Sequence, residues 1–300
     1  MGAQIQGAVE EARELQGPAS SGGDAQVIAL WLGRFDSPHT RRAYRRQAAR
    51  FLAFVGRPLG AVTLADVQAF SATLGDAAPA TRANAMAVLK SLFGFAQEIG
   101  YIRYNVTKPV KLPKVRNRLP ERMMDEADTL RLIAGEPNPR NRALLTLIYG
   151  GGLRVSEAPA LCWRDTMRRD EQGGVEAGQV TVHGKGGVTR VILLSPNTWR
   201  LLSALRQDGG ADEPIFRSRK RGGRLDQSQV HRIVKAAAAR AGLSPQVSAH
   251  WLRHAHATHA LDRGAPISLV RQTLGHASIA TTGRYLHAKP ADSSARYLLV

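Results

Sequence analysis

Residues 151–157 read Gly-Gly-Leu-Arg-Val-Ser-Glu, and this stretch decides how the second half of the chain is interpreted. It follows residues 139–150, which have the length and apolar character of a buried helix. Arg154 therefore stands just after glycines, at a helix end where ordinary packing does not explain a charge. A lone arginine in such a place is usually a surface residue or an ion-pair partner, so its meaning depends on the segments that accompany it.

Further segments of the second half also carry polar residues that packing does not explain. Gly184-Lys185-Gly186 places a lysine at the tip of a hairpin between strand-like runs in residues 179–194. The others are His250-Trp251-Leu252-Arg253-His254 and Leu274-Gly275-His276, and Tyr285 follows nine residues after that last histidine. Each alone has an ordinary explanation, since Gly-Lys-Gly is a common turn and such a tyrosine is usually core. We therefore base the interpretation of the second half on the occurrence of these segments together and in this order.

The charge balance indicates a polyanionic partner. The chain has 42 Lys and Arg against 24 Asp and Glu, a formal net charge of +18. Nucleic acid is the commonest partner of such a chain, although a basic surface without specificity has the same composition. The single cysteine, Cys162, excludes an internal disulfide and fits the cytoplasm. The apolar run at 143–153 is shorter than the ~20 residues of a membrane span, so we expect a soluble protein without a membrane partner.

The first half predicts a small helical bundle. Residues 1–24 lack periodicity and predict a flexible N-terminal arm. Ser37-Pro38 is typical of a helix start, and Thr63 with Asp66 is typical of a capping box. A longer helix is expected over residues 79–99, ending at a glycine cap. We assign residues 25–108 to this helical DNA-binding domain.

Basic residues gather on one helix of this bundle and after it. The helix that begins near Pro38 has an apolar face and an opposite face with Arg41, Arg42, Arg45, Arg46 and Arg50. Such a face is often merely solvated; in this chain we favour contact with phosphates. Residues 109–123, with Lys114 and Arg116 among prolines, predict a basic linker along the DNA backbone. Residues 124–300 then form the second domain, with helices near 124–134 and 139–150 and again from about Ser195.

The histidines near residue 250 raise the alternative of a metal site. His250 and His254 have the four-residue spacing of a zinc-binding helix. Trp251 stands where that motif requires glutamate, and no cysteine pair supplements the histidines. We therefore expect no metal.

Together the segments resemble the catalytic signature of the tyrosine recombinase (phage integrase) family, most closely its compact Xer-type members, from about residue 25 to the end. The resemblance implies a mainly α fold: an N-terminal helical bundle, the SAM-like core-binding domain, and a mostly helical catalytic domain with a small antiparallel β-sheet. Ala249 and Pro159 depart from the family pattern and leave the subfamily open. The catalytic residues that the resemblance implies are Arg154, Lys185, His250, Arg253, His276 and Tyr285, with Glu157 supporting Arg154.

The implied reaction cleaves and rejoins DNA strands through a 3′-phosphotyrosyl bond to Tyr285. A free tyrosine has a pKa near 10, which the field of Arg154 and Arg253 should lower while both clamp the phosphate. Lys185 is the expected general acid for the leaving 5′ oxygen. His250 is the expected proton acceptor or an additional phosphate ligand, and His276 is expected to donate a hydrogen bond to the phosphate. The phosphotyrosyl bond conserves the energy of the phosphodiester, so no metal, ATP or other cofactor is implied.

The resemblance also implies partners: double-stranded DNA at a specific recombination site, and a homo-tetramer or a hetero-tetramer with a related recombinase. The setting would be the cytoplasm, at the nucleoid. The apolar end, residues 297–300, would dock on a neighbouring protomer or on its own domain. Alternatives are a type IB topoisomerase-like nicking–closing enzyme and a mobile-element integrase or transposase of the same family. A non-catalytic DNA-binding protein would not need the full catalytic set.

Overall fold

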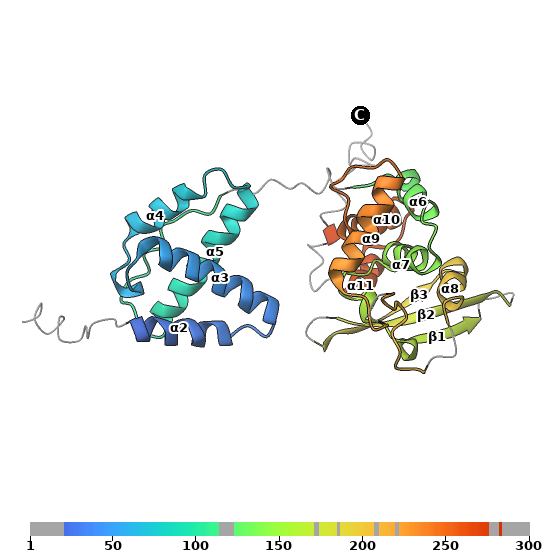
Figure 1. The fold of residues 1–300 in the computed structure, drawn as a ribbon, viewed down its shortest axis with the longest axis horizontal. Helices are drawn as coiled ribbons and strands as arrows, with labels where there is room; N and C mark the ends of the chain where they lie inside the picture. The colour runs from blue at the N-terminus through green and yellow to red at the C-terminus, as the bar shows by residue number, and fades with distance from the viewer. Residues whose placement is uncertain are drawn as a thin grey trace, which may run out of the picture. The chain divides into compact units, whose positions relative to one another are not determined.

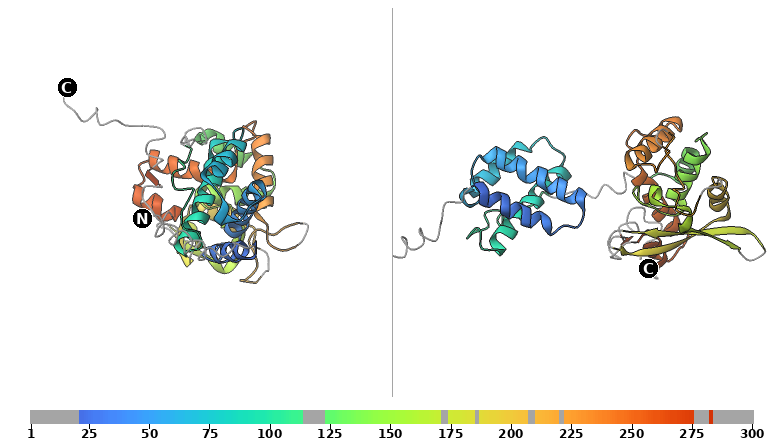
Figure 2. Two further views of the ribbon diagram at one scale, coloured as in Figure 1. Left: turned by 90° about the vertical axis from the view of Figure 1, so that its left-hand side faces the viewer. Right: turned by 60° about the horizontal axis from the view of Figure 1, so that its bottom comes forward.

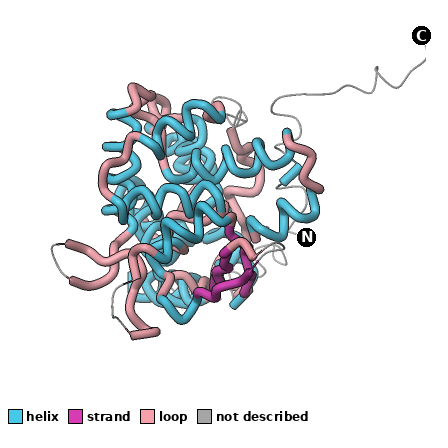
Figure 3. The backbone as a smooth tube through the Cα atoms, turned by 90° about the vertical axis from the view of Figure 1, so that its right-hand side faces the viewer, coloured by secondary structure: helices cyan, strands magenta, loops and turns pink. Residues whose placement is uncertain are grey.

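The structure is a computed structural model of the chain. It describes residues 21–113, 123–170, 174–184, 187–206, 210–219, 222–275 and 282–283. The chain divides into two compact units, residues 1–116 and 117–300 (Figure 1). The described residues are mainly helical with one small antiparallel sheet, which confirms the predicted fold class (Figure 3). None of the helices in this described part combines the length and apolarity needed to cross a bilayer.

The first unit is a helical bundle around an aromatic core. Its elements are α2 (Ser21–Gly33), α3 (Pro38–Val55), the 3-10 turn η1 (Leu59–Ala61), α4 (Leu64–Thr73) and α5 (Pro79–Glu98). The Phe51 ring of α3 lies edge-on to Phe70 of α4 and to Phe93 of α5, with ring centroids 5.1 and 5.9 Å away. All three rings are buried, so one cluster holds these helices together.

Helix ends in this unit follow the predicted signals. Ser37 accepts a hydrogen bond from the Thr40 backbone, and Thr63 and Asp66 form a reciprocal capping box. The predicted arm over residues 1–24 needs one correction, because α2 begins at Ser21. The Asp24 carboxylate accepts from the Leu59 backbone at 2.9 Å and from the Tyr101 hydroxyl at 2.7 Å, which ties this part of α2 to the bundle. Residues 1–20 lie outside the described residues.

The second unit adds a sheet to its helices. Its elements are α6 (Glu126–Ala134), α7 (Pro139–Gly150), η3 (Ala158–Ala160), η4 (Trp163–Asp165), β1 (Thr166–Asp170), β2 (Glu176–His183), β3 (Thr189–Leu194), α8 (Pro196–Ser203), α9 (Gln227–Arg240), α10 (Ala249–Asp262) and α11 (Ile267–Leu274). The strands are antiparallel in the order β1-β2-β3, and Thr181 pairs with Val191. The β2–β3 hairpin was predicted. The sequence did not predict strand β1, because residues 166–170 lack apolar alternation. They form a strand because they pair with β2.

The sheet is covered by α8, and the neighbouring helices bring distant segments together (Figures 1 and 2). Gly178 of β2 faces the Trp199 ring of α8, and α7 packs against both α8 and α10. Helix α11 contacts β3 and α10. The segment after α7, the strand β3 and the end of α11 therefore lie close to one another, and the candidate site is built from them.

Replacing Gly178 with alanine should destabilise the second unit by about 1–3 kcal/mol, because the new Cβ would lie only 2.0 Å from Cε3 of Trp199. The free energy of unfolding from urea titration measures the effect. Gly210→Ala is the control: nothing lies within 4 Å of its new Cβ, and its stability should stay within about 0.5 kcal/mol of the parent. Equal stability of the two variants would contradict the packing of α8 on β2.

Candidate active site

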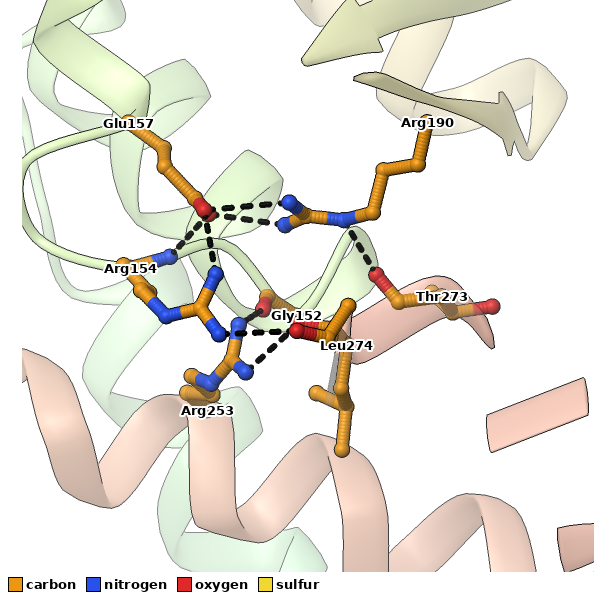
Figure 4. Close-up of polar contacts among 8 residues, drawn as sticks. Gly152, Arg154, Glu157, Arg190, Arg253, Thr273 and Leu274 are labelled. Atoms are coloured by element: carbon orange, nitrogen blue, oxygen red, sulfur yellow. Dashed lines mark hydrogen bonds and ion pairs between the residues drawn. The ribbon is translucent and has the colours of Figure 1, made fainter. Parts of the chain in front are cut away.

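The site is organised around the buried carboxylate of Glu157 (Figure 4). Oε1 accepts hydrogen bonds from Nη1 of Arg154 at 2.6 Å and from Nη1 of Arg190 at 3.0 Å. Oε2 accepts from the Arg154 backbone N–H at 2.8 Å and from Nη2 of Arg190 at 2.7 Å. The side chains of Glu157 and Arg190 are only 5% and 6% exposed. We call Arg154, Glu157 and Arg190 the carboxylate–arginine network.

The network keeps Glu157 ionised. Burial raises the pKa of Glu157, but the hydrogen bonds from Arg190 and Arg154 outweigh burial and lower it from 4.5 to about 2. Two guanidiniums therefore surround one carboxylate, and the network carries a net positive charge at neutral pH. Such a charge suits an anionic ligand beside it.

The two predicted clamp residues, Arg154 and Arg253, meet at the end of α11 (Figure 4). Nη2 of Arg154 donates to the Gly275 carbonyl at 3.0 Å, and Nη2 of Arg253 donates to the Leu274 carbonyl at 2.7 Å. Nη1 of Arg253 also donates to the Gly152 carbonyl at 2.6 Å. Arg253 is 2% exposed, whereas the Arg154 side chain is 37% exposed. Arg154 is therefore the more accessible of the two.

Glycines of the motifs allow this close approach. Gly152 and Gly275 have φ of +59° and +62°, a conformation that favours glycine. A Cβ on Gly152 would lie 2.8 Å from side-chain atoms of His256 and Leu274. A Cβ on Gly275 would lie 3.2 Å from the Arg190 side chain. Side chains at these positions would displace the groups that form the site.

The hairpin reaches the same network. The Gly184 N–H donates to the Val188 carbonyl at 2.8 Å. A methyl group on Gly184 would lie 4.0 Å from Oε1 of Glu157 and 3.8 Å from Nη1 of Arg190. Gly184 directly precedes Lys185 in the sequence, as Gly275 precedes His276. The predicted site residues that lie outside the described part are Lys185, His276, Tyr285, Lys114 and Arg116.

The histidines of α10 have different surroundings. His250 is exposed, and its ring centroid lies 4.0 Å from that of His254. His250 precedes Arg253 by three residues, so both lie on one side of α10. Burial lowers the pKa of His256 to about 4, and the charge of Arg253 adds to the effect, so this imidazole is neutral at neutral pH.

His259 is held by hydrogen bonds at both ring nitrogens. Nδ1 lies 3.0 Å from the Tyr149 hydroxyl, and Nε2 lies 2.9 Å from the Met124 carbonyl. Nε2 must donate to that carbonyl, because a carbonyl oxygen only accepts. His259 thus ties α7 and the start of the second unit to α10.

Sequence reasoning missed Arg190. Burial alternates along β3, and Arg190 lies on the same buried face as Ile192 and Leu194. A charge on the apolar face of a strand indicates a buried partner. That signal was present in the sequence, but nothing local identifies Glu157 as the partner.

The arginines predicted to contact DNA in the first unit lie on the surface of α3. Arg41, Arg42, Arg45 and Arg46 are exposed, whereas Ala48 and Phe51 of the same helix are buried. The exposure of these four arginines agrees with the predicted basic surface of the helix. Contact of the basic face with phosphates stays a prediction.

Comparison with known families and proteins covers nearly the whole chain. Residues 119–292 match the model described as "Phage integrase family", and residues 27–99 match "Phage integrase, N-terminal SAM-like domain". The chain is 36% identical to tyrosine recombinase XerC of Rhodospirillum centenum, over 88% of this chain and 80% of that protein. It is 33% identical to XerC of Pelobacter propionicus, over 84% of this chain and 85% of that protein.

Solved structures share the fold. A lambda integrase dimer bound to a COC′ core site gives a TM-score of 0.72 at 20% identity, covering 90% of this chain and 95% of that one. XerH recombinase bound to palindromic difH substrate gives 0.70 at 23% identity, covering 89% and 81%. The chain belongs to the phage integrase family and is a site-specific tyrosine recombinase of the Xer type.

Glu157→Gln should remove a stability term that depends on pH. The folded-state pKa of Glu157 is depressed to about 2, so its contribution is complete above the unfolded pKa and is lost as pH falls. The wild type should therefore be more stable than Glu157→Gln at neutral pH, and the gap should shrink between about pH 5 and about pH 2. Urea unfolding at a series of pH values measures the gap. A gap independent of pH would show that Glu157 is not held ionised.

Proposed function

We propose that the chain binds double-stranded DNA at a specific recombination site and cleaves and rejoins its strands through Tyr285. The supporting observation is the meeting of Arg154 and Arg253 at the consecutive carbonyls of Leu274 and Gly275. These arginines come from separate motif segments, and Gly275 leads directly to a third. Packing alone does not require two guanidiniums at one turn of the chain.

Arg154 is the group best placed to receive the phosphate. A guanidinium has five N–H groups. Within the described residues, Arg154 donates a hydrogen bond from Nη1 to Glu157 and one from Nη2 to the Gly275 carbonyl. Its remaining N–H groups and its exposed side allow bonds to non-bridging phosphate oxygens. Arg253, deeper in the site, adds positive charge and fixes the turn. Charge that develops in the transition state is then stabilised by groups already in place.

The chemical steps fall to the remaining motif residues. The Tyr285 oxygen attacks the phosphorus, its proton passes to His250, and the 5′ oxygen leaves with a proton from Lys185. His276 donates a hydrogen bond to the phosphate. The 3′-phosphotyrosyl bond keeps the strand activated. A 5′ hydroxyl from a partner duplex then attacks the same phosphorus and releases Tyr285.

Recombination requires several protomers on DNA. A lambda integrase of this fold forms a tetramer bound to a Holliday junction, with a TM-score of 0.67 to this chain. We infer a similar tetramer here, formed by this chain alone or with a related recombinase, acting on DNA at the nucleoid. Products that join strands of two different duplexes distinguish this activity from nicking and closing of one strand.

Tyr285→Phe should bind DNA like the wild type and form no covalent adduct, because only the hydroxyl nucleophile is removed. A nicked suicide substrate traps the adduct, which migrates as a protein–DNA species on a denaturing gel. Adduct formed by the Phe variant would contradict the assignment and direct attention to Tyr297.

Lys185→Ala should slow cleavage of ordinary DNA strongly, and much less when sulfur replaces the leaving 5′ oxygen. A thiolate leaves without a proton, so the substrate makes a general acid unnecessary. Arg154→Ala is the contrast, since loss of a phosphate clamp should slow both substrates by a similar factor, about 10²–10³. If the sulfur substrate restored the cleavage rate of both variants equally, the roles assigned to Lys185 and Arg154 would be wrong.

A further inference from the structure

We propose that Arg190 is a positioning residue for strand cleavage, which links the Arg154 segment, the base of the Lys185 hairpin and the end of α11. The proposal rests on the proposed function, because it assigns Arg190 an effect on that same reaction. Arg190 lies outside the motif segments 151–157, 184–186, 250–254 and 274–276.

Figure 4 shows the Arg190 side chain joined to Glu157 and to the Thr273 carbonyl. Both terminal nitrogens donate to Glu157, at 3.0 and 2.7 Å, and Nε donates to the Thr273 carbonyl at 2.7 Å. A Cβ on Gly275 would lie 3.2 Å from Nη1 of Arg190, and a Cβ on Gly184 would lie 3.8 Å from the same atom, so both glycines lie near the guanidinium. Arg190 itself lies near the start of β3, the strand that returns from the hairpin.

The bidentate pair fixes the plane of the Glu157 carboxylate. Oε1 is shared between Arg190 and Arg154, and Oε2 between Arg190 and the Arg154 backbone. Without Arg190, the carboxylate is free to rotate and form a bidentate pair with Arg154 alone. Arg154 would then leave the orientation in which it donates to the Gly275 carbonyl and binds the phosphate. A leucine would fill the same buried face of β3 without ionic partners, so packing does not explain an arginine here.

Another ion pair in the second unit offers a matched control. Glu136 is 3% exposed and is bound by Arg240 of α9. Arg240 also donates to the Gly135 carbonyl. Like Arg190, it joins a buried carboxylate and a backbone oxygen, although its side chain is 39% exposed. Among the described residues, its hydrogen bonds and ion pair do not reach the motif segments. Arg240→Met should therefore lower stability without changing the chemistry.

The experiment measures the single-turnover cleavage rate on a nicked suicide substrate at saturating DNA, together with the Kd for the same DNA. Arg190→Met should cleave about 10²-fold more slowly, the usual effect of misplacing catalytic groups by about 1 Å, while its Kd stays within about threefold of the wild type. Arg190→Lys keeps the charge without the fork and should recover part of the rate. Arg240→Met should cleave at the wild-type rate at a temperature where every variant is folded.

A pH profile separates positioning from general loss of structure. Loss of Arg190 removes two of the bonds that hold Glu157 ionised, so the pKa of Glu157 should rise in Arg190→Met. The cleavage rate of this variant should then fall with decreasing pH over a range where the wild type is constant. Adding Glu157→Gln should abolish that fall, because the titrating group is gone.

Cleavage by Arg190→Met at the wild-type rate would overturn the proposal. A loss of cleavage rate that is fully explained by the fraction of unfolded protein, as expected for Arg240→Met, would overturn it as well. If Arg190→Met does not fold, the proposal is tested instead by the cleavage rate and the pH profile of Arg190→Lys. A wild-type chain that forms no adduct on cognate DNA is a different outcome, which rejects the proposed function and this inference together.

Discussion

The arrangement of the site depends on one ionic contact, the buried Glu157 carboxylate between Arg154 and Arg190. A carboxylate with 5% exposure is costly to bury unless opposite charges and hydrogen bonds surround it. Those partners come from the segment after α7 and from β3, and Arg190 extends the contact to Thr273 at the end of α11. Segments that are distant in sequence are thereby required to meet, and this requirement orients Arg154.

A site organised in this way has its charge in place before a ligand arrives. The network is net positive, Arg253 adds a further guanidinium at the same turn, and Arg154 faces outward enough to donate to an anion. Groups fixed in this manner do not need to reorganise as charge develops on a phosphate, which is the largest source of stabilisation in many active sites. The physical arrangement accords with membership of the phage integrase family.

Local features of the fold were predictable from the sequence, and features that depend on long-range pairing were not. Ser37, Thr63 and Asp66 define helix starts through contacts within three residues. Strand β1 has no such local signal and exists because β2 pairs with it. In the site, the motifs identified Arg154 and Arg253, but not the carbonyls that orient them. Arg190 was visible as a charge on an apolar strand face, and its partner, 33 residues away, was not.

The most direct test of this account is the titration of the Glu157 carboxyl group, followed by its side-chain ¹³C chemical shift in protein labelled at glutamate. The signal is assigned by its absence from Glu157→Gln. The account predicts that the carboxyl stays ionised as the pH falls through 4.5 and titrates only near about 2, or on unfolding. A midpoint at or above 4.5 in the folded protein would show that the two arginines do not hold the carboxylate, and would contradict the account.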